Sequence, residues 1–160
     1  MLSTDQLNKK LYSLLPAEFY GTMPLDYIKT INSRPDFNKN NKHVCFIFNS
    51  DPSHLSGKHW LAVSFPPQDF KLIIIDSQAL KFDKFNKTLD AYIKSSSRSI
   101  VERMPYPIQG HMPYCGIYCA FILYHLKDFN FNLHRLVENY FSDCNLSYND
   151  RLIESWWNSL

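Results

Sequence analysis

Several features that would place this chain in a specialised class of protein are missing from its sequence. No uninterrupted apolar run approaches the roughly 20 residues of a membrane-spanning helix, and the first segment, MLSTDQLNKK, lacks the apolar stretch of a secretory signal. Lys and Arg total 17 against 15 Asp and Glu, a net charge of +2, so no strongly basic surface for nucleic acid is expected. We therefore expect a protein that is neither secreted nor bound to a membrane.

Cysteine is sparse as well, and none of the four forms a C-x-x-C pair of the kind that holds zinc. Dense cysteine frameworks belong to small secreted domains, so the sequence favours a reducing compartment, the cytoplasm or the nucleus. The apolar supply is ample, since 45% of the 160 residues are hydrophobic and 16% are aromatic. Because no repeat or linker interrupts the chain, we predict a single domain over residues 1–160.

The pattern of apolar residues predicts an α+β fold. Strands are predicted at 43–48, 59–65, 70–76 and 99–106, and helices at 4–15, 84–94, 115–126, 133–141 and 148–157. Three of the strands follow one another directly, and the turn between the second and third contains Pro66 and Pro67. This order favours a largely antiparallel central sheet packed by helices.

Glycine is rare, and its distribution is informative. Three of the four glycines lie within two residues of a side chain that could take part in chemistry. Glycine permits tight backbone turns and close approach by another chain segment. The pairs are Gly57 with His59, Gly110 with Gln109, and Gly116 with Cys115. This clustering predicts that the three side chains belong to one functional site.

Cys115 is the candidate nucleophile of that site. It begins the predicted apolar helix, and a helix N-terminus stabilises the negative charge of a thiolate; the alternative is a small buried apolar residue. His59, at the start of a strand, could accept the thiol proton, forming the Cys–His pair that activates such nucleophiles. His111, four residues before the cysteine, is the competing candidate.

Asp76 and Gln109 supply two further groups. If the two neighbouring strands form a hairpin, Asp76 falls at the same end of the sheet as His59, where it could accept the imidazole Nδ1–H. The alternative is an aspartate that caps the following turn. Gln109, in a loop six residues before Cys115, could donate its amide to an oxyanion together with the backbone N–H of the cysteine.

Joined, these segments resemble a known family. SGKHWLAVSF, LIIIDSQ and IQGHMPYCGIYCAFILYHL are similar to the adenovirus-type cysteine proteases (adenain) and, more loosely, to proteases that remove SUMO-like modifiers. Both groups carry His-Trp, an acidic residue 17 positions later, and Gln shortly before Cys-Gly. EFYGTMPLD and HVCFIFNS resemble the upstream segments of adenoviral and related transposon (Maverick or Polinton) or virophage proteases, so the resemblance covers roughly residues 18–127.

The resemblance implies an adenain-like fold and a role for each residue. Cys115 is expected to be the nucleophile and His59 the general base and acid. Asp76 would orient the histidine, and Gln109 would donate to the oxyanion. Trp60 would line the peptide-binding groove, with simple packing on the sheet as the alternative. No metal and no cofactor are expected.

The sequence also departs from the adenoviral pattern. Asp76 stands where adenoviral enzymes carry Glu, and the six-residue spacing from Gln109 to Cys115 is closer to the modifier proteases. No cysteine lies between residues 46 and 114, where adenoviral enzymes bind an activating peptide through a disulfide. The sequence therefore gives no support for an activating peptide, and its near-neutral charge gives none for DNA as a cofactor.

The resulting hypothesis is a viral maturation protease. It would be a monomeric cysteine endopeptidase that cleaves capsid and core precursor polypeptides at glycine-containing sites, inside the infected cell and the virion. The alternative is an isopeptidase for a SUMO- or ubiquitin-like modifier. A third hypothesis is a non-catalytic module, either a degenerate protease fold or a zinc-binding protein using His111, Cys115 and Cys119.

Overall fold

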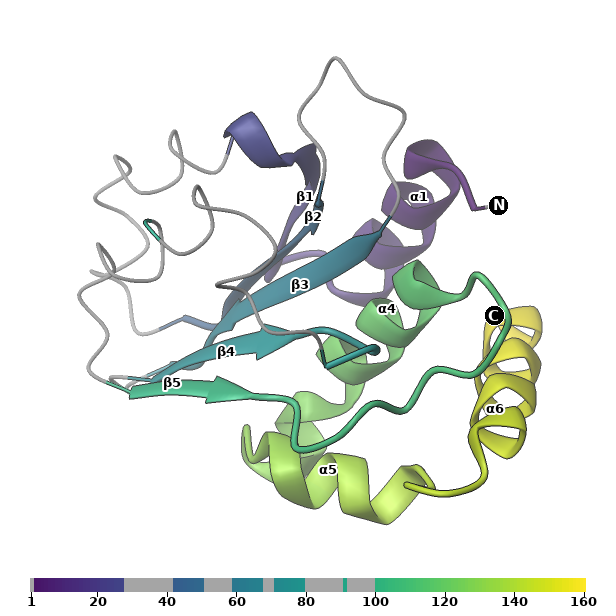
Figure 1. Cartoon of the computed structure of the whole chain (residues 1–160). Coiled ribbons are helices and arrows are strands. Elements are labelled where there is room, and N and C mark those ends of the chain that lie inside the picture. The colour runs from purple at the N-terminus through teal and green to yellow at the C-terminus, as the bar shows by residue number, and fades with distance from the viewer. Residues whose placement is uncertain (1, 28–41, 51–58, 68–70, 80–90, 92–99) are drawn as a thin grey trace.

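The computed structural model describes residues 2–27, 42–50, 59–67, 71–79, 91 and 100–160 (Figure 1). Its elements are, in order, α1 (Thr4–Leu14), β1 (Phe19–Pro24), the 3-10 helix η1 (Leu25–Tyr27), β2 (Val44–Asn49), β3 (Trp60–Phe65), β4 (Lys71–Ile75), β5 (Ile100–Arg103), α4 (Cys115–His125), the 3-10 helix η4 (Leu126–Phe129), α5 (Leu133–Tyr140) and α6 (Leu146–Ser159). The predicted α+β class is confirmed. The helix predicted at 84–94 lies outside the described residues except for Ala91.

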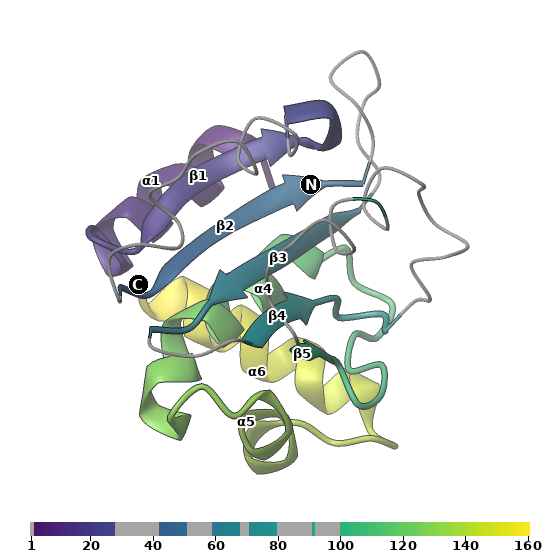
Figure 2. The same cartoon turned by 90° about the vertical axis from the view of Figure 1, so that its left-hand side faces the viewer.

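The five strands form one mixed sheet in the order β1-β2-β3-β4-β5 (Figure 2). β3 runs antiparallel to both β2 and β4, and the predicted β3–β4 hairpin is confirmed by the pairing of Ala62 with Ile75. The two edge strands depart from the antiparallel arrangement, because β1 is parallel to β2 and β5 is parallel to β4. Each parallel pair is joined by a connection long enough to return the chain to the same end of the sheet.

Strand β1 was not predicted from the sequence, and its residues explain why. It contains Gly21, whose φ of +115° lies in a region that other residues rarely adopt, and it ends at Pro24. The register with β2 shifts between Phe19 and Thr22. Glycine and proline usually indicate a turn, but an edge strand tolerates both.

The described helices α1, α4, α5 and α6 lie on one side of the sheet (Figures 1 and 2). Alternate residues of the central strands form two separate apolar clusters, as the two-residue period of a strand requires. The helix-facing cluster includes Cys45, Ile47, Ala62, Ile73 and Ile75, and the cluster on the opposite face includes Phe46, Phe48, Leu61, Val63, Leu72 and Ile74. Both faces are therefore apolar, which explains the nearly continuous apolar segments in the sequence.

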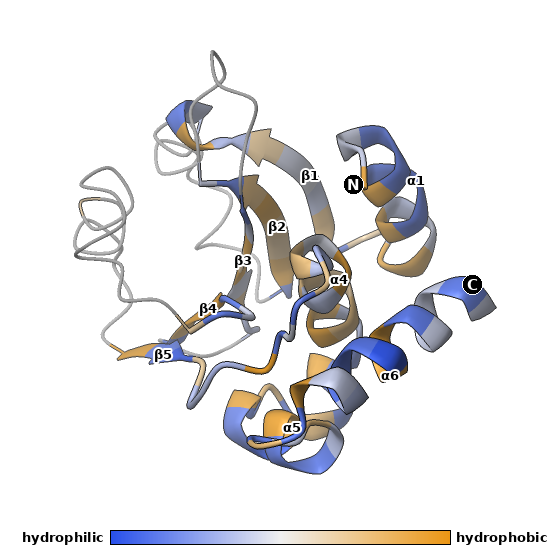
Figure 3. Cartoon of the chain, turned by 45° about the vertical axis from the view of Figure 1, so that its right-hand side comes forward, coloured by the Kyte–Doolittle hydropathy of each residue, from blue (hydrophilic) through white to orange (hydrophobic). Residues whose placement is uncertain are grey.

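Helix α4 occupies the centre of the helical layer. Every residue from Cys115 to Leu123 is buried, and the helix contacts β3, α1 and α6 (Figure 3). A helix that is apolar on all sides is stable only when it is surrounded. The expected buried helix beginning at Cys115 is thus present, and its first turn faces the end of β3.

Candidate active site

The β3–β4 hairpin brings His59 and Asp76 together at one end of the sheet. His59 directly precedes β3 and Asp76 directly follows β4, and both residues are buried. Nε2 of the imidazole lies 2.7 Å from Oδ1 of the carboxylate. The sequence-based expectation that Nδ1 makes this contact is wrong: Nε2 is the nitrogen farther from the backbone, and it reaches across to the neighbouring strand.

Asp76 also holds the turn that follows it. Its Oδ1 accepts the backbone N–H of Gln78 at 3.0 Å, which is the aspartate turn that was the alternative interpretation of this residue. The two interpretations therefore apply together, because the bond from Gln78 fixes the carboxylate that contacts His59. With Nε2 engaged by Asp76, Nδ1 is the ring nitrogen left to exchange a proton with another group.

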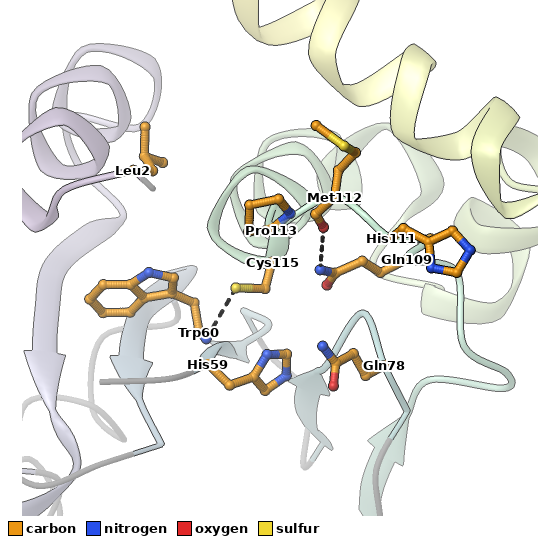
Figure 4. A pocket seen from close by; sticks show the side chains of 10 residues that line it. Leu2, His59, Trp60, Gln78, Gln109, His111, Met112, Pro113 and Cys115 are labelled. Carbon is orange, nitrogen blue, oxygen red and sulfur yellow. Dashed lines mark hydrogen bonds between the residues drawn. The ribbon is translucent and has the colours of Figure 1, made fainter. Parts of the chain in front are cut away.

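Cys115 is the first residue of α4 and lies beside β3. The backbone N–H of Trp60 donates to Cys115 Sγ at 3.5 Å (Figure 4). Tyr114, the N-cap residue, provides no side-chain cap, so the partial positive charge of the helix N-terminus acts on the sulfur. Both features stabilise a negative charge on Cys115.

The charge state of His59 follows from its neighbours. Burial disfavours the imidazolium, but hydrogen bonds to Asp76 and Cys115 and the negative charges of both outweigh burial and raise the pKa of His59 from 6.5 to about 9. His59 is therefore protonated at neutral pH and is positioned beside the sulfur as its counter-ion.

Two hydrogen bonds fix the orientation of the Gln109 side-chain amide. Its Oε1 accepts a hydrogen bond from the Ser77 hydroxyl at 2.5 Å, and its Nε2 donates to the Met112 carbonyl at 2.7 Å. Figure 4 shows the amide end of the Gln109 side chain on the side of the pocket where Cys115 lies. An amide nitrogen carries two hydrogens, so one N–H of Gln109 is left for a ligand atom near the sulfur.

A pocket of about 210 Å³ lies over these groups. Its lining comprises Leu2, His59, Trp60, Gln78, Gln109, Gly110, His111, Met112, Pro113 and Cys115 (Figure 4). Four of the five predicted site residues therefore border one space, and the fifth, Asp76, stands behind His59. The pocket is also lined by Leu2, Gln78 and Met112, which were not predicted because nothing in their local sequence distinguishes them.

Within the described residues, His111 and Cys119 do not form a metal site with Cys115. His111 is exposed at the edge of the pocket, whereas Cys119 is fully buried and donates to the Trp60 carbonyl at 3.6 Å. Burial raises the pKa of the Cys119 thiol well above its ordinary value. Within the described part of the chain, no group of three His, Cys, Asp or Glu side chains is arranged to hold a metal ion, so the zinc hypothesis finds no support there.

Two of the clustered glycines have a physical explanation in close contacts. A Cβ at Gly116 would lie 3.2 Å from the Trp60 indole, so the glycine lets this ring pack against the first turn of α4. A Cβ at Gly110 would collide with the Asp150 carboxylate. The third, Gly57, lies outside the described residues.

Comparison with known proteins shows a shared fold. No protein family model and no curated protein matches the sequence. Among solved structures, an ASFV protease superposes with a TM-score of 0.53 at 12% identity, over 78% of this chain and 57% of that chain. This chain shares the fold of that protease. A de-sumoylating protease aligns over 98% of this chain and 68% of its own, at 17% identity and a TM-score of 0.44.

The match to the ASFV protease shows the fold alone, so the roles of individual residues are inferred from the geometry of the site. This chain spans a little over half the length of the ASFV protease.

None of the helices within the described ranges has both the length and the apolar character to cross a membrane.

Proposed function

We propose that this chain is a cysteine endopeptidase with Cys115 as its nucleophile. The observation that carries the proposal is the convergence of three groups on one pocket: Asp76 binds Nε2 of His59, and His59 lines the same pocket as Cys115, the first residue of α4. A nucleophile, a base and a group that orients the base define activated cysteine chemistry. The fold shared with a protease supports this reaction class.

The first step is acylation of the sulfur. The Cys115 thiolate attacks the carbonyl carbon of the scissile peptide bond, forming a C–S bond and placing a negative charge on the oxygen. The free N–H of Gln109 and the backbone N–H of Cys115 donate to this oxyanion. The His59 imidazolium then gives its Nδ1 proton to the amine as the C–N bond breaks.

The second step releases the product. Neutral His59 removes a proton from a water molecule, which attacks the thioester and restores the thiolate as the acid product leaves. Asp76 keeps Nε2 as the donor nitrogen throughout, so Nδ1 stays directed toward the reacting atoms. His59 supplies the proton of the first step and recovers one from the water of the second, and the scheme uses neither a metal nor another cofactor.

For the biological role we propose maturation of viral precursors. The upstream segments that resemble virophage and transposon proteases support this role, as does the shared fold with the ASFV protease. The substrate would be a capsid or core precursor polypeptide cut at glycine-containing sites. The enzyme would act as a monomer in the infected cell and the virion.

A second candidate function is removal of a ubiquitin-like modifier. Asp76 in place of Glu, and the six residues from Gln109 to Cys115, match the modifier proteases rather than the adenoviral ones. An isopeptidase uses the same acyl chemistry, with a lysine side-chain amine as the leaving group. The two candidates therefore differ in substrate and share one mechanism.

One experiment separates these outcomes. Purified wild-type protein and Cys115→Ala are incubated with a capsid precursor from the genome that encodes this chain, with Gly-Gly-ended modifier conjugates and with short glycine-containing peptides. Discrete precursor fragments from the wild type alone support the maturation protease. Release of the modifier faster than cleavage of short peptides favours the isopeptidase. Identical behaviour of wild type and Cys115→Ala on all three substrates overturns the proposed enzyme.

A further inference from the structure

The final helix α6 contacts the loop that carries Gln109. Asp150, buried in α6, accepts the backbone N–H of Gly110 at 3.0 Å and that of Met112 at 3.2 Å. The Tyr118 hydroxyl donates to the same carboxylate at 2.8 Å. Three donors from the loop and from α4 therefore converge on one acidic side chain of α6.

The preceding residue makes a second attachment. Asn149 is fully buried, and its Nδ2 donates to the Ile108 carbonyl at 2.9 Å. Residues 109–113 form neither helix nor strand, so these side-chain contacts take the place of the backbone pairing that would otherwise fix the segment. The close approach also explains Gly110, since a Cβ there would collide with Asp150.

Met112 connects this attachment to the candidate oxyanion donor. Its N–H donates to Asp150, and its carbonyl accepts Nε2–H of Gln109 at 2.7 Å. Displacement of Met112 would therefore release the acceptor that holds the Gln109 amide. Asp150 reaches the glutamine through one intervening residue and has no contact with the sulfur among the contacts of the described residues.

We propose that Asp150 is a positioning residue that sets the Gln109 amide for oxyanion stabilisation. The inference rests on the proposed cysteine protease function and adds to it a role for α6. A carboxylate suits this position because it accepts several hydrogen bonds and donates none. An asparagine of nearly the same size would turn its NH₂ group toward one of the donors.

The test starts from Asp150→Asn, with Glu154→Gln as the matched control. Glu154 lies one turn further along α6 and accepts only the Tyr114 hydroxyl in the described structure, at 2.7 Å. We expect Asp150→Asn to lower kcat by roughly 10- to 100-fold through misplacement of a catalytic group, with KM little changed. Glu154→Gln should leave both constants near wild type.

A double-mutant cycle with Gln109→Ala distinguishes positioning from general structural damage. Gln109→Ala should itself lower kcat by roughly 100-fold, and Asp150→Asn added to it should lower kcat little further. The rate at which iodoacetamide alkylates Cys115 should be unchanged in Asp150→Asn. Equal losses of kcat in both backgrounds, or a parallel loss of alkylation, would overturn the inference.

A readout independent of activity completes the test. We expect the side-chain NH₂ hydrogens of Gln109 to exchange with solvent faster in Asp150→Asn than in wild type, measured by nitrogen-15 NMR. Unchanged exchange refutes the positioning role even if the protein is a protease. Conversely, the exchange can be faster in Asp150→Asn while the activity does not depend on Cys115. That result refutes the proposed function but supports the role of Asp150 in holding the Gln109 amide.

If Asp150→Asn does not fold, Gly110→Ala takes its place in the same cycle. The added Cβ would collide with the Asp150 carboxylate and would also press on the backbone carbonyl of Leu146 at the start of α6, while the sequence of α6 stays the same. We expect the same fall in kcat and the same lack of additivity with Gln109→Ala. An additive result from Gly110→Ala overturns the inference.

Discussion

Ser77 contacts Gln109 through both its side chain and its backbone. The Ser77 hydroxyl donates to Oε1 of Gln109 at 2.5 Å, and the Ser77 carbonyl accepts the backbone N–H of Gln109 at 3.0 Å. Ser77 is fully buried and directly follows Asp76. The turn that holds the carboxylate partner of the histidine therefore also determines which end of the glutamine amide faces the pocket.

Replacement of Ser77 by alanine is expected to impair turnover more than binding. Without the hydroxyl donor, the Gln109 amide can rotate by half a turn and present its oxygen to the oxyanion. We expect kcat to fall by roughly tenfold or more, since a misdirected oxyanion donor costs up to about 100- to 1,000-fold. Steady-state kinetics on a peptide substrate measure the effect, and the exposed Ser147→Ala serves as the control. A wild-type kcat in Ser77→Ala would show that the hydroxyl has no part in orienting the amide.

The alkaline limit of activity is expected near pH 9. His59 must carry a proton to protonate the leaving amine, and its pKa is raised to about 9. As pH rises through that value the imidazolium is lost, so kcat/KM should decline. A pH profile of kcat/KM locates this limit, and activity that does not vary with pH contradicts the mechanism.

Asp76→Asn should move that alkaline limit to lower pH. The hydrogen bond and the negative charge of Asp76 are two of the causes that raise the pKa of His59, and asparagine removes the charge. The imidazolium should then be lost closer to its ordinary pKa of 6.5. The matched measurement is the pH profile of Asp128→Asn, whose carboxylate contacts His125 instead. An unshifted limit in Asp76→Asn would mean that the carboxylate does not control His59.

Alkylation should distinguish among the four cysteines. Iodoacetamide reacts with thiolates, so we expect Cys115 to be modified with loss of activity. Cys45 and Cys119 should resist, because burial raises the pKa of both thiols. Cys144 is exposed, and its modification should leave activity unaffected. Peptide mass spectrometry locates the adducts, with Cys144→Ser as the control; full activity after stoichiometric labelling of Cys115 would exclude it as the nucleophile.

Trp60→Ala should weaken substrate binding and spare the nucleophile. The indole lines the pocket, whereas the contact with Cys115 comes from the backbone N–H, which alanine retains. We expect KM to rise by about tenfold or more, the usual cost of removing an aromatic contact at a binding centre. The rate of Cys115 alkylation should remain near wild type. An unchanged KM would favour the interpretation of Trp60 as a packing residue.

Much of the fold can be predicted because the central elements have strong, local signals. The three apolar strands and the buried helix at Cys115 follow from hydrophobic pattern and length. Strand β1 could not be predicted, since Gly21 and Pro24 indicate a turn and only pairing with β2 makes the segment extended. Tertiary contacts decide such edge strands.

The residues of the site also fall into those that could be predicted from the sequence and those that could not. His59, Asp76, Gln109 and Cys115 could be singled out because each lies at the end of a predicted element or next to a glycine. Asp150 gave no such signal, as an acidic residue within an amphipathic helix usually faces solvent. Its contact with Gly110 spans 40 positions of sequence, and a single sequence contains no information on which distant residue a glycine accommodates.

The place of Asp150 in the chain has a consequence for the timing of synthesis. A ribosome completes the sulfur, the imidazole and the amide well before it adds the aspartate that fastens their loop, because residue 150 follows residue 115. A nascent chain of the proposed protease would therefore lack the contact that positions the Gln109 amide until α6 has emerged and docked. Order of translation would delay its full turnover in the same way that Asp150→Asn lowers it.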